Sequence, residues 1–249
     1  MKSSVVKHSI VAVSTTGIYH RLKGLPCQDS YAYQKDKDKV VAVVSDGAGS
    51  AKYGKIGAKI VCETLSALLF QANISQIHQK VIDAIEIARQ KLEFHRFNKT
   101  KTTAGLLDFS ATLVGFFYQH GKGVFFHIGD GAAVALYVPK SKKFILSEPE
   151  NGIFPSETFF YTMDDWKDSL RFTPVEKAKS VFLMTDGVTS FALNKNRSAL
   201  ENNFIEPINA FLLKEADNRK ASRALKNTLE TPRAANLNPD DKTLLWVKL

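Results

Sequence analysis

The sequence predicts a single α+β domain spanning residues 1–249, and three observations lead to this prediction. Short runs of β-branched and aromatic residues lie at hairpin-like spacing between turn residues. Two long segments with helical periodicity come as a pair, whereas a doubly wound parallel sheet would need helices alternating with single strands. With 249 residues, of which 44% are hydrophobic, the chain can form one sizeable core. No repeat or linker divides it.

The predicted strands are runs rich in Val, Ile, Thr and Phe, and residues typical of turns separate them. In chain order they cover residues 9–13, 31–34, 40–45, 112–118, 123–128, 134–138, 181–185 and 243–249. Residues 98–108 and 148–169 are predicted to be loops, the second of them rich in Pro, Asp and aromatic residues.

Two predicted helices lie between the third and fourth strands. Apolar residues at helical spacing form a stripe along each: Ile56, Ile60, Leu65, Leu68 and Leu69 in the first, and Ile77, Val81, Ile85, Ala88 and Leu92 in the second. A third helix is predicted around residues 204–213, with more helix toward Leu229.

The net charge of +9 and the isoelectric point near 9.4 raise the question of nucleic-acid binding. The basic residues are dispersed along the chain and no nucleic-acid motif is present, so we expect no nucleic-acid partner. A basic surface can instead attract anionic proteins by long-range steering.

The sequence also bears on where the protein works. No apolar run approaches the roughly 18 residues that a membrane span needs, and the stretch 10–13 after the basic start is too short for a signal peptide. Two cysteines do not make a disulfide framework. We therefore expect a cytoplasmic protein with no membrane partner.

Two carboxylates stand at the ends of buried-looking strands, each followed by glycine, in the pairs Asp46-Gly47 and Asp186-Gly187. Carboxylates are ligands for hard cations such as Mg²⁺ or Mn²⁺, and glycine lets a backbone carbonyl approach the ion. An Asp-Gly pair is also a favoured tight turn, so one pair alone is weak evidence for a metal site.

Two further acids strengthen the metal interpretation. Asp29 precedes the second predicted strand, and Asp240 precedes the last one. Four carboxylates at strand edges predict one common site.

Six short blocks of the sequence carry a further signal. They are GLPCQD (24–29), SDGAGS (45–50), FSATL (109–113), HIGDGAA (127–133), TDGVT (185–189) and DDKT (240–243). Together and in this order, they resemble the metal-dependent protein phosphatases of type 2C, in particular the compact bacterial members. The resemblance extends from about Ser9 to Leu249.

The resemblance implies two antiparallel β-sheets packed as a sandwich, with helices on both outer faces. It implies a serine/threonine protein phosphatase that hydrolyses phosphomonoesters with a hydroxide bridging two Mn²⁺ or Mg²⁺ ions. The expected substrates are phosphoproteins, and the expected partner is a cognate Ser/Thr kinase system in bacterial signalling. The protein is expected to be a monomer.

The resemblance also assigns roles to single residues. Asp46 would bridge both metals and the Gly47 carbonyl would bind one of them. Asp186 and Asp240 would hold the other metal, with Asp241 as a rival to Asp240. Asp29 would act through a metal-bound water. The catalytic acids would be Asp29, Asp46, Asp186 and Asp240.

Three departures from the family bear on phosphate binding, proton transfer and metal binding. Gly24 stands where most members have an arginine that binds substrate phosphate, so His20, Arg21 and Lys23 are the candidates to replace it, with a solvated loop as the alternative. Ala48 replaces a histidine that acts as general acid in some members. Water, His20 or His127 would then protonate the leaving group.

The third departure is Ser190, which replaces an acid that helps to hold a third metal together with the counterpart of Asp130. A neutral hydroxyl is a weak ligand, so Asp130 marks a third site that is doubtful.

The departures leave an alternative function open. The chain could be a catalytically weak or inactive pseudophosphatase that binds phosphoproteins and regulates a partner. Metal-dependent hydrolysis of p-nitrophenyl phosphate separates the two functions. A third interpretation, a two-metal nuclease, predicts salt-sensitive binding of DNA or RNA.

Overall fold

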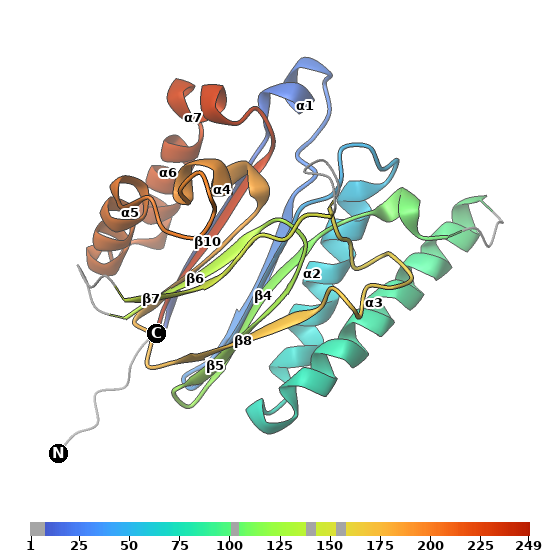
Figure 1. The fold of residues 1–249 in the computed structure, drawn as a ribbon, viewed down its shortest axis with the longest axis horizontal. Coiled ribbons are helices and arrows are strands. Elements are labelled where there is room, and N and C mark those ends of the chain that lie inside the picture. Colours follow the sequence, from blue (N-terminus) through green and yellow to red (C-terminus); the bar gives the residue numbers. More distant parts are fainter. Residues whose placement is uncertain (1–7, 101–104, 138–142, 153–157) are drawn as a thin grey trace.

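The computed structural model describes residues 8–100, 105–137, 143–152 and 158–249. Two five-stranded antiparallel sheets pack face to face, and helices cover both outer faces (Figure 1). The first sheet has the order β1 (Ser9–Thr15), β10 (Lys242–Lys248), β9 (Ser180–Met184), β6 (Ala132–Leu136) and β7 (Phe144–Ser147). The second has the order β2 (Ser30–Lys35), β3 (Lys39–Ser45), β4 (Leu113–Gln119), β5 (Lys122–Ile128) and β8 (Arg171–Glu176).

The helices divide between the two faces. The pair α2 (Gly54–Phe70) and α3 (Ile77–Thr100) covers the second sheet (Figure 1). The first sheet is covered by α4 (Asp186–Ala192), α5 (Asn202–Lys214), α6 (Asn218–Leu229) and α7 (Pro232–Leu237). The short helix α1 (Ile18–Leu22) follows β1, and 3₁₀ turns occupy Ile74–Gln76 and Leu107–Phe109.

Strand β3 shows why the central strands are apolar without alternation. Val41 and Val43 pack against α2 and α3, whereas Val40, Ala42 and Val44 pack against the first sheet. All five side chains are 0% exposed. A strand covered on both faces needs apolar residues at every position, and this is why residues 40–45 predict a buried strand.

The predicted α-β-β-α sandwich is confirmed. Each of the eight predicted strands corresponds to an observed one to within about two residues, although Val138 lies outside the described residues. The two long helices and the one around residues 204–213 are present, and helix continues to Leu229 in α6. Helix α3 extends to Thr100, into the start of the predicted loop 98–108.

Two strands were not predicted, and both lie at sheet edges. Strand β7 has only four residues. Strand β8 contains Pro174, which cannot donate to a ladder and is therefore tolerated at an edge. Among the described residues, no helix is long and apolar enough to cross a membrane.

A buried amide joins α5 to the first sheet. Asn209 is 6% exposed, and its Oδ1 accepts hydrogen bonds from Ser180 Oγ at 2.8 Å and from Trp246 Nε1 at 3.0 Å. These donors belong to β9 and β10, so one side chain satisfies two polar groups of neighbouring strands. Leaving buried donors unpaired costs about 1–3 kcal/mol each.

We expect Asn209→Ala to lower the free energy of unfolding by roughly 2–4 kcal/mol, because it leaves both donors without an acceptor. Urea denaturation followed by circular dichroism measures this. Glu206→Ala, an exposed change on the same helix, is the control and is expected to cost less than about 0.5 kcal/mol. Equal midpoints for the two variants would contradict the role given to Asn209.

Candidate metal centre

Three carboxylates meet where strands of both sheets end. Asp46 follows β3, Asp130 follows β5, and Asp186 follows β9 and begins α4. One carboxylate oxygen of each lies within 4.8 Å of the others. The sandwich therefore brings together acids that are far apart in the sequence. Asp46 and Asp186 were predicted to share a site. Asp130, expected at a doubtful third site, lies directly beside them.

The backbone around Asp46 is fixed from both sides. Its N–H donates to Thr112 Oγ1 at 3.0 Å, and its carbonyl accepts from the Thr112 N–H at 2.9 Å. A Cβ at Gly47 would lie 2.4 Å from the backbone of Gly54, so only glycine fits there. The Gln28 amide nitrogen faces the Gly47 carbonyl at 3.0 Å, which places the predicted backbone ligand beside the loop of Asp29.

Asp29 lies against this cluster and is 7% exposed. Its Oδ2 accepts a hydrogen bond from Thr185 Oγ1 at 2.8 Å. Burial, together with the charge of Asp241, raises the pKa of Asp29 to about 8. Asp29 therefore holds a proton more firmly than an exposed aspartate.

The two adjacent acids near the C-terminus have different environments. Asp241 is 1% exposed, and its oxygens accept from the backbone N–H groups of Gly17, at 2.7 Å, and Gln28. Its Oδ2 is also 2.8 Å from His20 Nδ1. Asp240 is half-buried, and its Oδ1 accepts from the Asp241 N–H at 2.8 Å. Both carboxylate oxygens of Asp241 are thus engaged by hydrogen bonds within the protein, whereas Asp240 has an oxygen that can bind an ion.

Asp240 lies near the three clustered acids, but it does not belong to the group whose carboxylate oxygens lie within 4.8 Å of one another. Burial and the charge of Asp29 raise the pKa of Asp46 most, and the charge of Asp240 comes next. For Asp186 the charge of Asp240 adds to the larger effects of burial, Asp46 and Asp130 on its pKa. Gly187, directly after Asp186, has no room for a Cβ because the Asp241 carbonyl would lie 1.8 Å away. This close approach brings the start of α4 against the start of β10.

The acids suit a hard cation. The Oδ1 atoms of Asp29, Asp130 and Asp186 are buried and have no hydrogen-bond partner among the described residues. Burial raises the pKa values of Asp46, Asp130 and Asp186 above the usual range, and the neighbouring acids add to the effect. Unpartnered carboxylate oxygens, with no thiolate or imidazole among them, match the ligand preference of Mg²⁺ or Mn²⁺.

The predicted phosphate-binding residues are spread over α1 and the turn that follows it. Arg21 and Lys23 are exposed. His20 is 7% exposed and faces Asp241. His127, the other candidate general acid, is 0% exposed, and its Nδ1 lies 3.0 Å from Ser147 Oγ. Burial lowers the pKa of His127 well below its usual value, so it is a neutral core residue.

Two residues beside the acids were missed in the sequence. Lys242 is 2% exposed, and its ammonium group donates to the Asp240 carbonyl at 2.8 Å. Its position in the block 240–243 is the signal that could have drawn attention to it. Thr158 Oγ1 donates to Asp130 Oδ2 at 2.7 Å. It belongs to a predicted loop, where no sequence pattern marks it.

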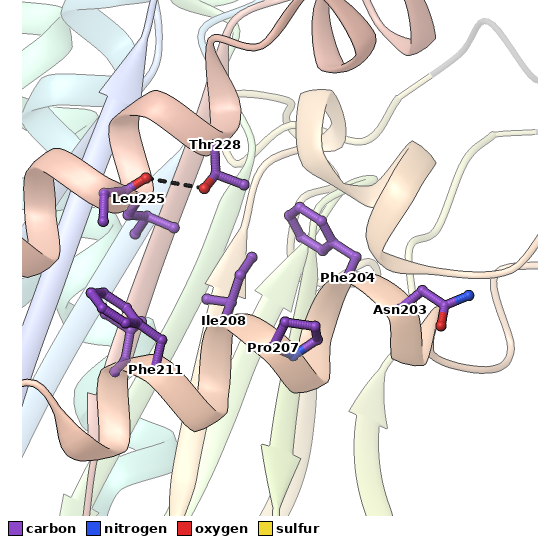
Figure 2. Close-up of a pocket in the computed structure, with 9 residues that line it drawn as sticks. Asn203, Phe204, Pro207, Ile208, Phe211, Leu225 and Thr228 are labelled. Atoms are coloured by element: carbon purple, nitrogen blue, oxygen red, sulfur yellow. Dashed lines mark hydrogen bonds between the residues drawn. The ribbon is translucent and has the colours of Figure 1, made fainter.

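A cavity of about 280 Å³ lies between α5 and α6, away from the acids (Figure 2). Phe204, Ile208, Phe211 and Leu225 give it apolar walls, and Thr228 hydrogen-bonds within α6 to the Ala224 carbonyl at 3.0 Å. None of the described residues that line this cavity is titratable, so it does not share the chemistry of the acid cluster.

The crowded carboxyl groups predict a pH dependence of stability in the metal-free protein. The folded-state pKa of Asp29 is about 8 and that of an unfolded aspartate near 3.8. The stabilisation by the bound proton is therefore complete below about pH 4 and is lost as the pH rises through 8. We expect the melting temperature in EDTA to fall between pH 5 and pH 8.

Asp46→Asn is the informative comparison for this pH dependence, because it removes one of the repelling charges. The variant should melt higher than the native protein at pH 8, and its melting temperature should fall less between pH 5 and pH 8. The buried histidines are common to both proteins and cancel in the difference. If the melting temperatures of the two proteins fell equally between pH 5 and pH 8, the inferred repulsion among the acids would be contradicted.

Comparisons with known proteins agree with this geometry. The family model described as Protein phosphatase 2C matches residues 16–230. No curated protein matches the chain. Among solved structures, the chain is similar to the serine/threonine phosphatase Stp1 from Staphylococcus aureus, with 16% identity and a TM-score of 0.66 over 98% of this chain and 96% of that one.

Two further structures give the same result. PppA, a regulatory component of T6SS in Pseudomonas aeruginosa, has 14% identity and a TM-score of 0.67 over 98% of each chain. The Mycobacterium tuberculosis phosphatase PstP/Ppp has 13% identity and a TM-score of 0.64 over 97% of this chain and 98% of that one. At these identities the likeness concerns the fold, while the family model covers most of the sequence. The chain belongs to the protein phosphatase 2C family of serine/threonine phosphatases.

Proposed function

We propose that this protein is an active, metal-dependent serine/threonine protein phosphatase that hydrolyses phosphomonoesters on proteins. One observation carries the proposal: Asp46, Asp130 and Asp186 bring carboxylate oxygens within 4.8 Å of one another, and two of these residues have buried oxygens without a partner. Such an arrangement destabilises the metal-free protein and has a clear use once dications are bound.

The chain's own residues have distinct tasks in this proposal. Asp46, Asp186 and Asp240 supply the carboxylates that hold two Mn²⁺ or Mg²⁺ ions, with the Gly47 carbonyl as a further ligand. Asp29, fixed by Thr185, positions water beside Asp46. When bound, two such ions activate water for attack and neutralise charge on the phosphoryl oxygens.

The environment of the adjacent acids supports Asp240 rather than Asp241 as the ligand. Both oxygens of Asp241 already accept hydrogen bonds from the backbone, and His20 occupies one of them further. Withdrawing Asp241 would leave the buried N–H of Gly17 and the part-buried N–H of Gln28 unpaired, and an unpaired buried donor costs about 1–3 kcal/mol. Asp240 uses its Oδ1 for the Asp241 N–H, so its Oδ2 can bind an ion without breaking that contact.

The substrates in this proposal are phosphoproteins that a cognate Ser/Thr kinase system produces, in the cytoplasm, with the enzyme acting as a monomer. The net charge of +9 supports attraction of anionic phosphoproteins over a distance. The alternative is a regulatory pseudophosphatase, which the absence of arginine at Gly24 and of histidine at Ala48 favours. Turnover separates the two.

We expect the native protein to hydrolyse p-nitrophenyl phosphate and a phosphothreonine peptide with Mn²⁺ and not with EDTA. Asp46→Asn and Asp186→Asn should each lower kcat by roughly a hundredfold or more, because each removes a charged ligand from a dication. Asp38→Asn, an exposed change in the β2–β3 turn, is the control.

Circular dichroism of the same samples tests whether the variants stay folded. Near-native turnover of either site variant at saturating Mn²⁺ would show that the acids do not carry the reaction. A native protein that binds Mn²⁺ and has no turnover would be the pseudophosphatase.

The number of bound ions is a separate prediction. Ser190 is exposed and offers a neutral hydroxyl, so we expect calorimetry to detect two Mn²⁺ per chain and no third, millimolar-affinity phase. Ser190→Asp should create or strengthen a third site. Three well-occupied ions in a crystal of the native protein soaked in Mn²⁺ would contradict this.

A further inference from the structure

Arg197 lies in a short, closed loop after α4. An isolated bridge between Leu193 and Leu200 closes the loop. Inside it, Asn194 Oδ1 accepts from the backbone N–H groups of Ser198 and Ala199, at 2.9 and 3.1 Å. Arg197 itself has a φ of 56°, a left-handed conformation that costs free energy in a residue other than glycine. The loop therefore holds Arg197 in a defined and unfavourable backbone position.

A continuous series of contacts leads from Arg197 to the acid cluster. Its Nη1 donates to Asn151 Oδ1 at 2.7 Å. Asn151 forms a bridge with Thr158, whose Oγ1 donates to Asp130 Oδ2 at 2.7 Å. Asn151 and Thr158 thus lie between the guanidinium and Asp130, and the positive charge stands on the Asp130 side of the site.

The electrostatics agree with this placement. Burial raises the pKa of Asp130, while the hydrogen bond from Thr158 and the charge of Arg197 act in the opposite direction. Arg21 acts on the other side of the cluster, because its charge lowers the pKa of Lys242, after the larger effect of burial. Arg197 therefore acts on Asp130, whereas Arg21 acts on Lys242.

We propose that Arg197 binds the phosphate group of the substrate, and this inference rests on the proposed phosphatase function. A guanidinium has five N–H donors and suits bidentate contact with phosphate oxygens. The hydrogen bond to Asn151 uses one nitrogen of the group. Gly24 provides no such cation, whereas the charge of Arg197 acts on Asp130 across the contacts through Asn151 and Thr158.

The competing role is that of a strut, in which Arg197 does no more than tie its loop to Asn151. Two variants separate the roles. Arg197→Gln keeps a hydrogen-bond donor for Asn151 and removes the charge. Asn151→Ala removes the contact and keeps the guanidinium. A phosphate-binding residue is sensitive to the first change and a strut to the second.

The experiment compares Arg197→Ala, Arg197→Gln, Arg197→Lys and Asn151→Ala with Arg219→Ala, which removes one exposed positive charge from α6. Each is assayed for kcat and KM with a phosphothreonine peptide and for inhibition by inorganic phosphate. We expect Arg197→Ala and Arg197→Gln to raise KM and the inhibition constant about tenfold, as the loss of one charge-assisted hydrogen bond predicts. Arg197→Lys should lie between them and the native protein.

Asn151→Ala and Arg219→Ala should change both constants less than about twofold. Native constants in Arg197→Gln, or an effect of Asn151→Ala as large as that of Arg197→Ala, would overturn the proposal in favour of the strut. If the native protein had no turnover, the phosphatase function would fail. Calorimetric binding of inorganic phosphate to the Mn²⁺-loaded variants would then decide the role of Arg197 by the same ratios.

Discussion

Carboxylates packed at one end of a two-sheet sandwich repel one another, and much of the local structure offsets this repulsion. Hydroxyl groups take a large part. Thr185 Oγ1 donates to Asp29 and accepts from the Thr243 N–H at 2.9 Å, so one hydroxyl joins β9, β10 and the entrance of β2. Thr158 donates to the Asp130 carboxylate in the same way, whereas Thr112 accepts from the backbone N–H of Asp46 and fixes its position. The buried ammonium of Lys242 adds positive charge beneath Asp240.

The sequence predicted the layers well because both faces of the central strands are covered. In β3 every side chain from Val40 to Val44 is buried, and this leaves an unbroken apolar run that is easy to recognise. The edge strands β7 and β8 left no comparable signal. Strand β7 is short, and β8 contains Pro174, a residue that argues against a strand when it is considered without its neighbours.

The site was predictable in part. Asp46 and Asp186 were identifiable because each follows a buried strand and precedes glycine. The choice between Asp240 and Asp241 could not be made from spacing, since adjacent residues differ in the backbone groups that their side chains meet in three dimensions. The role proposed for Arg197 could not be predicted from the sequence for another reason. Its relation to Asp130 passes through two loops that are separate in the sequence.

The pairing of β1 with β10 has a consequence for the order of folding. Their partners include Ser14 and Thr243, which are 229 residues apart along the chain. Within the part of the chain that the structure describes, β1 has no other neighbour in its sheet, so it stays unpaired during synthesis until β10 has left the ribosome. Contacts between such distant residues slow folding and leave an exposed strand edge in the meantime. The nascent chain is therefore most dependent on chaperones just before β10 is made.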